Sequence, residues 1–253
     1  MQKNKNLTIY FDEAWRWPLA GPLFIWLICP IKNLSKKELA PFCDSKEICK
    51  TKREELFGYI QKLQNEWKIV SIPAWMTAAE IDKYWMSNAL HCAILRGIIQ
   101  VINELFPKYK IKNDLPNPLS IKIKVNMKYT NVLNYFSELN YQWIKIKLIM
   151  DWNRDFWLKK IFPFWEIKTI VSGDAKVKEI WMASIVAKVS RDRIMVDLPK
   201  KYIKYNFNKH KWYWTKEHKK LLEKYGPSDI HRKLFLKRIF PHHKFSKKLP
   251  EIF

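Results

Sequence analysis

Residues 10–22 read Tyr10-Phe11-Asp12-Glu13-Ala14-Trp15-Arg16-Trp17-Pro18-Leu19-Ala20-Gly21-Pro22, and much of the architecture follows from this segment. Residues 7–11, which lead into it, alternate weakly and are rich in β-forming side chains, so they predict a strand that runs into Asp12. The apolar run at 23–29, which ends at Pro30, predicts a second, buried strand. Two adjacent carboxylates therefore stand at the end of the first strand, and a turn connects it to the second.

Strands and helices alternate along the rest of the chain. Further strands are predicted at 68–73, 144–150 and 167–171, and helices at 52–63, 77–106, 179–195, 200–205 and 215–224. A capping box, Thr77-Ala-Ala-Glu80, starts the longest helix, and Thr215 and Gly226 suit the two ends of the last one. Residues 32–38 are expected to form a polar turn. This order of elements favours a mixed α/β sheet flanked by helices.

Four acids stand at or just beyond the predicted strand ends, namely Asp12, Glu13, Asp151 and Asp174. Strand ends meet at one edge of an open α/β sheet, which is the edge where ligands bind. Clustered carboxylates repel one another unless a cation lies between them, and oxygen ligands suit Mg²⁺ or Mn²⁺. Taken singly, each acid is more often a solvated loop residue, so the pattern alone leaves both interpretations open.

The segments around these acids resemble the sequence blocks of one enzyme family. With glycine at positions 15 and 17, the first segment would read D-E-A-G-R-G-P-L-A-G-P, the opening motif of ribonuclease HII. Further blocks resemble that family in the same order, with tryptophan at several family glycines: D-S-K at 44–46 followed by K-R at 52–53, L-I-M-D-W-N at 148–153, G-D-A-K-V at 173–177, I-W-M-A-S-I-V-A-K-V-S-R-D at 180–192, K-W-Y-W-T at 211–215 with His218, and H-R-K-L-F at 231–235.

The resemblance implies an α/β, ribonuclease H-like fold with a helical C-terminal extension. The first three strands of the mixed sheet would be antiparallel and the others parallel. Residues 1–198 would form the catalytic core, with 107–142 as an insertion, and residues 199–253 a helical substrate-binding part with a basic tail.

The resemblance also implies an activity, an endoribonuclease that hydrolyses the RNA strand of RNA–DNA hybrids and nicks DNA at embedded ribonucleotides. Asp12, Glu13, Asp151 and Asp174 match the metal-binding, catalytic acids of the family. Two Mg²⁺ or Mn²⁺ ions would activate a water and stabilise the leaving oxygen, giving 5′-phosphate products. Two nearby helix residues, Ser184 and Lys188, would either support this site or serve only in helix packing.

Five further residues match the substrate-binding positions of the family. Trp15, Arg16 and Trp17 match a Gly-Arg-Gly segment whose backbone reads a ribose 2′-hydroxyl, the group that distinguishes RNA from DNA. Lys46 matches a phosphate contact, and Tyr213 matches a tyrosine that packs on the sugar at the RNA–DNA junction. Without the resemblance, Lys46 would be read as a solvated charge and Tyr213 as part of an aromatic surface or core.

Tryptophan stands where glycine is expected. The chain has 5 Gly and 13 Trp, whereas an average glycine content would give about 18 glycines. We hypothesise that the source organism reads UGA as glycine and that the printed sequence translates UGA as tryptophan, at Trp15, Trp17, Trp152, Trp212 and Trp214 among others. The alternative is a Trp-rich, glycine-poor protein, in which indoles beside the acids would weaken or abolish cleavage.

The net charge of +23 and the pI near 9.8 favour a polyanionic partner, although a lysine-rich proteome also produces such values. The expected partners are RNA–DNA hybrid and ribonucleotide-containing duplex DNA, bound by a cytoplasmic monomer with no membrane contact. Cysteine spacing and histidine spacing fit neither a disulfide framework nor a zinc site. Two rival functions remain: another nuclease of the same superfold, and a protein that binds hybrids without cutting them.

Overall fold

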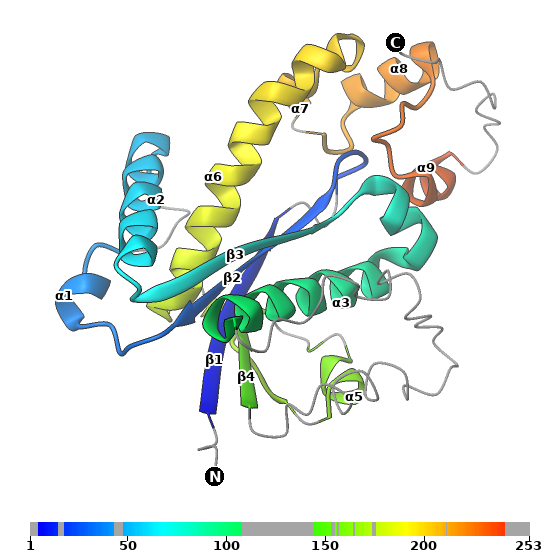
Figure 1. The fold of residues 1–253 in the computed structure, drawn as a ribbon. Coiled ribbons are helices and arrows are strands. Elements are labelled where there is room, and N and C mark those ends of the chain that lie inside the picture. Colours follow the sequence, from blue (N-terminus) through cyan, green and yellow to red (C-terminus); the bar gives the residue numbers. More distant parts are fainter. Residues whose placement is uncertain are drawn as a thin grey trace.

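The computed structural model describes residues 5–14, 18–42, 48–107, 144–152, 155, 157–163, 165–173, 176–210 and 212–240 (Figure 1). Its centre is a five-stranded sheet in the order β3-β2-β1-β4-β5. The strands are β1 (Lys5–Ala14), β2 (Leu23–Pro30), β3 (Ile69–Met76), β4 (Ile144–Met150) and β5 (Glu166–Thr169). All five coincide with predicted strands, and most extend beyond the predicted bounds.

The pairing is mixed in the way the sequence predicted. Strands β1, β2 and β3 are antiparallel neighbours, whereas β4 lies parallel to β1 and β5 lies parallel to β4. Parallel neighbours need a crossover connection, and the chain between β3 and β4 supplies it with a long helix. The ribonuclease H-like mixed sheet expected from the sequence is confirmed.

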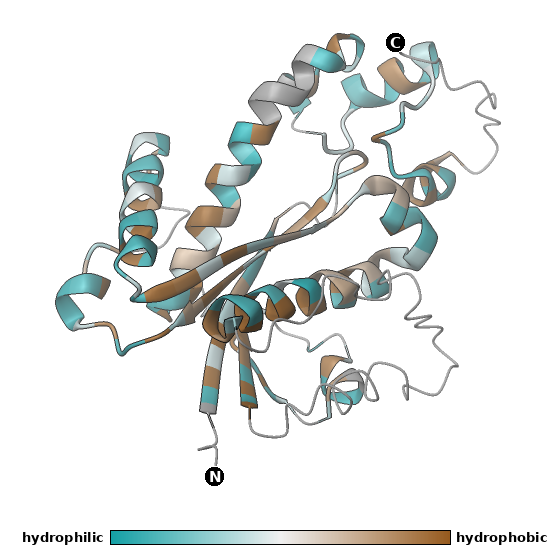
Figure 2. Cartoon of the chain, in the orientation of Figure 1, coloured by the Kyte–Doolittle hydropathy of each residue, from teal (hydrophilic) through white to brown (hydrophobic). Residues whose placement is uncertain are grey.

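Helices cover both faces of the sheet (Figure 1). Helix α3 (Ala78–Leu105) packs on one face, while α2 (Lys50–Asn65) and α6 (Lys178–Lys201) pack on the other. The face of α3 that packs on the sheet buries the apolar side chains Leu90, Ile94, Ile98 and Val101. Colouring by hydropathy shows the central strands as largely hydrophobic and the outer side of α2 as largely hydrophilic (Figure 2).

Among the described residues, four short helices form where no helix was predicted, at 36–39, 158–161, 207–210 and 233–239. The helix predicted at 200–205 is instead the end of α6 followed by a 3-10 turn at 203–205. Residues 36–39 form α1 (Lys36–Leu39) where a polar turn was expected, because Ser35 and Glu38 make a complete capping box. Within the basic tail, α9 (Lys233–Ile239) forms although its own N-cap provides no side-chain bond. The carboxylate of Asp82 accepts the N–H groups of residues 233 and 234 at 2.9 Å each, so a residue far away in sequence caps this helix.

The C-terminal helices form a separate cluster beside the end of the β1–β2 connection. It contains η4 (Ile203–Tyr205), α7 (Phe207–His210), α8 (Lys216–Tyr225) and α9, and its buried side chains pack on Leu19 and Ala20. As predicted, the Thr215 hydroxyl caps α8 and Gly226 ends it. A further short helix, α5 (Leu158–Ile161), precedes β5.

Apart from residue 107, the proposed insertion at 107–142 lies outside the described residues, and so does the exposed strand that the alternating residues 121–125 predict. The proposed division after residue 198 falls within α6, and that division remains a prediction.

Candidate active site

Two of the predicted acids lie at neighbouring strand ends. In the parallel register Phe11 of β1 pairs with Met150 of β4, so Asp12 and Asp151 follow directly on adjacent strands. Both side chains are half-buried. The sheet therefore brings together two carboxylates that are far apart in sequence, as their positions at strand ends predicted.

Gly173 fixes the orientation of Asp151. Its backbone N–H donates to Oδ1 of Asp151 at 2.7 Å. A Cβ at position 173 would lie 2.7 Å from Cδ1 of Ile180 and 3.3 Å from Cα of Asp151, so a larger residue would push this segment away from the sheet. Asp174, the next residue, lies outside the described residues.

Asp12 faces helix α6. Burial raises its pKa to about 6, a hydrogen bond from the Ser184 side chain and the charge of Lys188 oppose this rise, and the charge of Asp151 adds to it. Ser184 is fully buried, and it stands one helical turn before Lys188. Both residues therefore act on the carboxylate, which is more than the helix packing that their sequence pattern required.

The Glu13 side chain is hydrogen-bonded to the indole of Trp152. Nε1 of Trp152 donates a hydrogen bond to Oε2 of Glu13, and the indole packs edge-on against Phe11 with ring centroids 5.2 Å apart. The tryptophan at this family glycine position thus occupies one oxygen of a predicted metal ligand.

The donor chemistry of Asp12, Glu13 and Asp151 fits a hard divalent cation. All three offer carboxylate oxygens, and the repulsion between Asp12 and Asp151 is of the kind that a bound cation removes. Among the described residues, which omit Asp174, no three acids, histidines or cysteines are grouped closely enough to hold a metal ion.

Of the residues predicted to bind substrate, the described part of the chain includes only Tyr213. Trp15, Arg16, Trp17 and Lys46 lie outside it. The Tyr213 side chain is 42% exposed. Its preceding residue, Trp212, accepts a hydrogen bond at its carbonyl from the N–H of Leu19 at 2.9 Å. This hydrogen bond ties the backbone next to Tyr213 to Leu19, which follows the predicted substrate-binding residues 15–17 in the sequence.

Arg232 makes further hydrogen bonds between the C-terminal part and residues 19–22. The sequence assigned this arginine no role beyond its place in the H-R-K-L-F block. The side chain is fully buried, its Nε donates to the carbonyl of Gly21 at 2.8 Å, and Nη2 donates to that of Pro22 at 3.0 Å. Its backbone N–H donates to the Leu19 carbonyl. The burial of an arginine so close to the N-terminal motif could not be deduced from local sequence.

Two buried histidines, His218 and His231, form a hydrogen-bonded chain, and a third, His210, stacks on it. The Ser228 N–H donates to Nδ1 of His231 at 2.9 Å, so His231 carries its proton on Nε2 and donates it to Nε2 of His218 at 3.1 Å. Nδ1 of His218 then donates to the Tyr213 carbonyl at 3.0 Å. His210 stacks on His218 with ring centroids 4.1 Å apart. These hydrogen bonds connect the Tyr213 carbonyl to His218, His231 and Ser228, and so restrain the backbone at Tyr213.

This histidine cluster is uncharged. Burial lowers the pKa of His218 to about 4 and that of His231 to about 3, and the neighbouring histidines lower both further. A proton added to Nδ1 of His231 would face the Ser228 N–H, so the observed bonds require the neutral form.

Within the described part of the chain, none of the helices combines the length and apolar character that a membrane crossing requires.

Comparison with known proteins gives one consistent family. The family model described as Ribonuclease HII matches residues 104–238. The ribonuclease HII of Caldicellulosiruptor bescii is 32% identical over 232 residues, which cover 90% of this chain and 85% of that protein. The ribonuclease HII of Fusobacterium nucleatum is 35% identical over 236 residues, covering 93% and 87%.

Two solved structures share the fold. The ribonuclease H2 from Pyrococcus horikoshii aligns with a TM-score of 0.58 at 21% identity, covering 96% of this chain and all of the other. A chain of the PCNA:RNase HII complex from Archaeoglobus fulgidus aligns with a TM-score of 0.57 at 15% identity, covering 98% of this chain and all of the other. At these identities the likeness concerns the fold alone.

Proposed function

The chain belongs to the ribonuclease HII family, whose members are endonucleases that hydrolyse RNA in RNA–DNA hybrids and depend on divalent metal ions, and we propose that it also nicks DNA duplexes at embedded ribonucleotides by two-metal-ion catalysis. The products would carry a 5′-phosphate and a 3′-hydroxyl. The enzyme would work as a cytoplasmic monomer.

The observation that carries this proposal is the adjacency of Asp12 and Asp151 at the ends of β1 and β4, with Gly173 bonded to Asp151. Asp12, Glu13 and Asp151, together with Asp174, would hold Mg²⁺ or Mn²⁺. When bound, such ions activate a water and stabilise the charge that develops on the leaving oxygen. The chain itself would hold these carboxylates at a partly buried edge of the sheet. There Ser184 and Lys188 favour the ionised form of Asp12.

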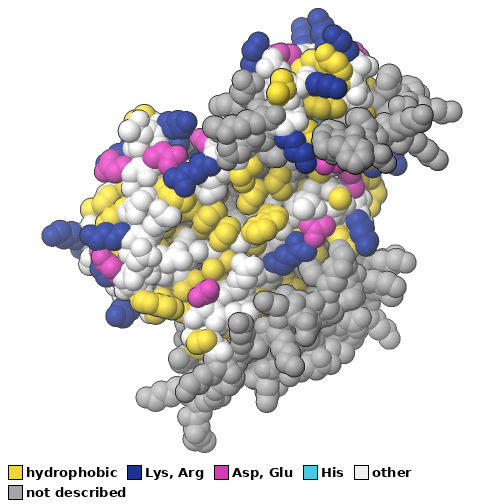
Figure 3. All heavy atoms as spheres, turned by 45° about the horizontal axis from the view of Figure 1, so that its top comes forward, with side chains coloured by type: hydrophobic (Ala, Val, Ile, Leu, Met, Phe, Trp, Pro, Cys, Tyr) yellow, Lys and Arg dark blue, Asp and Glu magenta, His cyan; other side chains and the backbone are white. Residues whose placement is uncertain are grey.

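Substrate binding would involve the predicted Trp15, Arg16, Trp17 and Lys46, together with Tyr213 on the C-terminal part. The C-terminal segment that carries Tyr213 is basic: its exposed Lys and Arg residues between 212 and 240 are Lys216, Lys219, Lys220, Lys224, Lys233, Lys237 and Arg238, against three acids. Figure 3 shows Lys and Arg side chains spread over one face of the molecule, including the C-terminal part at the top. Such a surface attracts the phosphates of a duplex in a salt-dependent way.

A nicking assay tests the proposal. The substrates are a DNA duplex with one internal ribonucleotide, an RNA–DNA hybrid and an all-DNA duplex, each with Mg²⁺ and then with Mn²⁺. The assay uses the chain as printed and a version with all 13 Trp replaced by Gly. Cleavage of the first two substrates but not of the third is the expected result for at least the glycine version.

Two substitutions in the active version locate the chemistry. Asp151→Asn should lower the cleavage rate by about 100-fold or more, a loss typical of removing one group that stabilises the transition state. Glu166→Gln is the matched control, since this exposed acid at the start of β5 pairs with Lys147 at 2.5 Å, at the opposite end of that strand from the acids, and should leave the rate unchanged.

The same experiment separates the rivals. A folded protein that binds hybrid in a salt-sensitive way but cuts nothing would support the binding-only alternative. Cleavage of the all-DNA duplex would support another nuclease of the superfold.

A further inference from the structure

Tryptophan occupies backbone conformations that favour glycine. Of the ten tryptophans among the described residues, four have positive φ: Trp67 (52°), Trp85 (66°), Trp157 (63°) and Trp212 (65°). Only a few per cent of non-glycine residues adopt such angles. The other described non-glycine residues with positive φ are Ser172 and Asn206. The residues with positive φ are thus concentrated in the bulkiest residue type.

Trp67 stands at the glycine position of a helix-ending motif. Helix α2 ends at Glu66, its C-cap, and Trp67 follows as the next residue. The N–H of Trp67 donates to the Gln64 carbonyl at 2.9 Å, and the N–H of Lys68 donates to the Leu63 carbonyl at 3.0 Å. These two bonds define the Schellman motif, in which the left-handed residue is usually glycine.

Trp85 has an even more restrictive geometry. It interrupts α3 with φ 66° and ψ 155°, and the helix is kinked there. This region of the Ramachandran plot is essentially confined to glycine, because the Cβ of any other residue collides with the backbone. Trp157, at φ 63° and ψ 14°, is a left-handed N-cap that makes no side-chain capping bond.

The indoles at three of these positions gain little from burial. Trp67, Trp85 and Trp157 are 59%, 66% and 60% exposed. A tryptophan selected for packing would bury most of its ring. These side chains therefore contribute little packing energy that could offset the strained backbone. A glycine at the same position would remove the backbone strain and give up only that small packing contribution.

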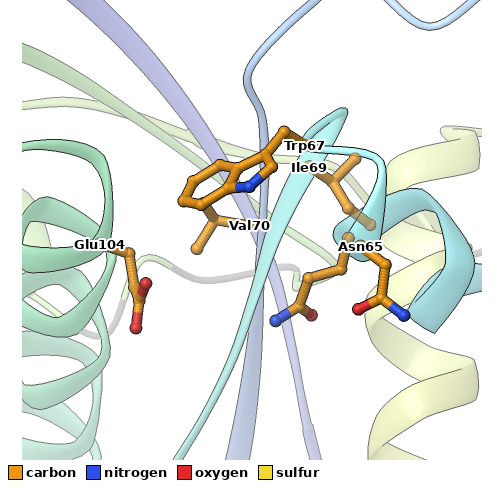
Figure 4. Close-up of a pocket in the computed structure, with 6 residues that line it drawn as sticks. Asn65, Trp67, Ile69, Val70 and Glu104 are labelled. Carbon is orange, nitrogen blue, oxygen red and sulfur yellow. The ribbon is translucent and has the colours of Figure 1, made fainter.

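Trp67 also creates a surface hollow. Figure 4 shows its indole over Val70, between Glu104 of α3 and Asn65 at the end of α2. The hollow measures about 290 Å³. Because the indole forms its outer wall, the hollow depends on the residue at position 67 and is a poor candidate for a ligand site.

From this geometry we infer that positions 67, 85, 157 and 212 are glycines in the protein that the source organism makes, because UGA codons at these positions are read as glycine. The inference goes beyond the proposed function and does not depend on it. Any other tryptophan with the same codon follows the same rule. At position 152 the change would remove the indole from Glu13 and return that carboxylate to the site.

The first test reads the codons and the protein. The gene should carry TGA at positions 67, 85, 157 and 212, and peptides of the protein isolated from source cells should have the mass of glycine there. TGG codons would overturn the inference, and so would TGA codons with the peptide mass of tryptophan. This test does not require the recombinant chain to fold.

The second test measures the conformational argument. Trp67→Gly, Trp85→Gly and Trp157→Gly should each raise the melting temperature of the printed chain by about 2–4 °C, since left-handed strain is relieved. Trp75→Gly is the matched control, because this tryptophan is also exposed (45%) but lies in the regular strand β3. It should lower the melting temperature. If Trp67→Gly lowered the melting temperature as much as Trp75→Gly does, the inference would be contradicted.

Discussion

The sheet and the C-terminal helices are held together by different chemistry. The largest core cluster, between the sheet and α3, consists almost wholly of aliphatic and aromatic side chains. The C-terminal part also has an apolar cluster, but it adds a larger group of buried polar and charged side chains, namely His210, His218, Ser228, His231 and Arg232. Elsewhere among the described residues the buried polar side chains are Ser71, His91 and Ser184. Apolar packing is insensitive to pH and tolerant of volume-conserving changes, whereas buried hydrogen bonds fail when one partner changes its protonation state. The proposed catalytic acids therefore lie on the sheet, whose stability should depend little on pH. Tyr213 lies on the C-terminal part, whose stability should depend on the protonation of buried groups.

Acidification should produce the largest difference between the two regions. The folded pKa values of His218 and His231, about 4 and about 3, lie below the value of 6.5 for an exposed histidine. The unfolded state therefore binds more protons, and the stabilisation present above pH 6.5 is lost as the pH falls toward 4. At pH 5 the loss should reach roughly 4 kcal/mol for the two histidines.

Hydrogen-exchange protection factors at pH 7 and pH 5 measure this effect. Amides of α8 should lose protection while those of α3 keep theirs. An equal loss in both helices would show that the two regions unfold as one unit.

Arg232→Met should have the next largest effect. The substitution keeps much of the side-chain volume but leaves the buried carbonyls of Gly21 and Pro22 without the guanidinium, at a cost of about 3 kcal/mol. Arg193→Met is the matched control, because Arg193 is 53% exposed and forms a surface ion pair with Glu54, so less than about 1 kcal/mol is expected. Urea unfolding measures both free energies, and similar values would indicate that the buried arginine adds nothing special.

The two threonine caps allow the smallest and most symmetrical test. Thr77 caps α3 on the sheet, and Thr215 caps α8 in the C-terminal part. Thr77→Ala and Thr215→Ala should each cost about 1 kcal/mol. We expect the first to lower the free energy of global unfolding and the second to lower only the free energy of local opening around α8, again measured by hydrogen exchange. Global destabilisation by both would remove the distinction between the regions.

Local sequence patterns predicted the sheet well because the apolar runs that lead into Asp12 and Asp151 give a clear strand signal. The capping box at Thr77 was readable, and the equivalent pattern at Ser35 and Glu38 was equally available, so α1 could have been predicted. The cap of α9 could not, because it comes from Asp82 on another helix.

The neighbouring positions of Asp12 and Asp151 could be predicted from the strand pattern, whereas the surroundings of these acids could not. The hydrogen bond from Ser184 to Asp12 depends on how α6 lies against β1, and the burial of Arg232 depends on contacts with the N-terminal segment. Such contacts arise from tertiary packing between distant parts of the chain, which neither periodicity nor spacing records. The positive φ of Trp85 likewise emerges only in three dimensions, although the shortage of glycine pointed toward it.

The segment 19–22 has a consequence for the order of events on the ribosome. The N–H of Leu19 bonds to residue 212, and the N–H of Gly21 bonds to Ile230 at 2.8 Å, so a stretch that is synthesised near the beginning finds its partners near the end. The sheet can assemble once β5 has emerged, but the chain beside the acids is fastened only after Arg232 is made. A nascent chain that stops short of that point would lack the hydrogen bonds that hold residues 19–22 in place.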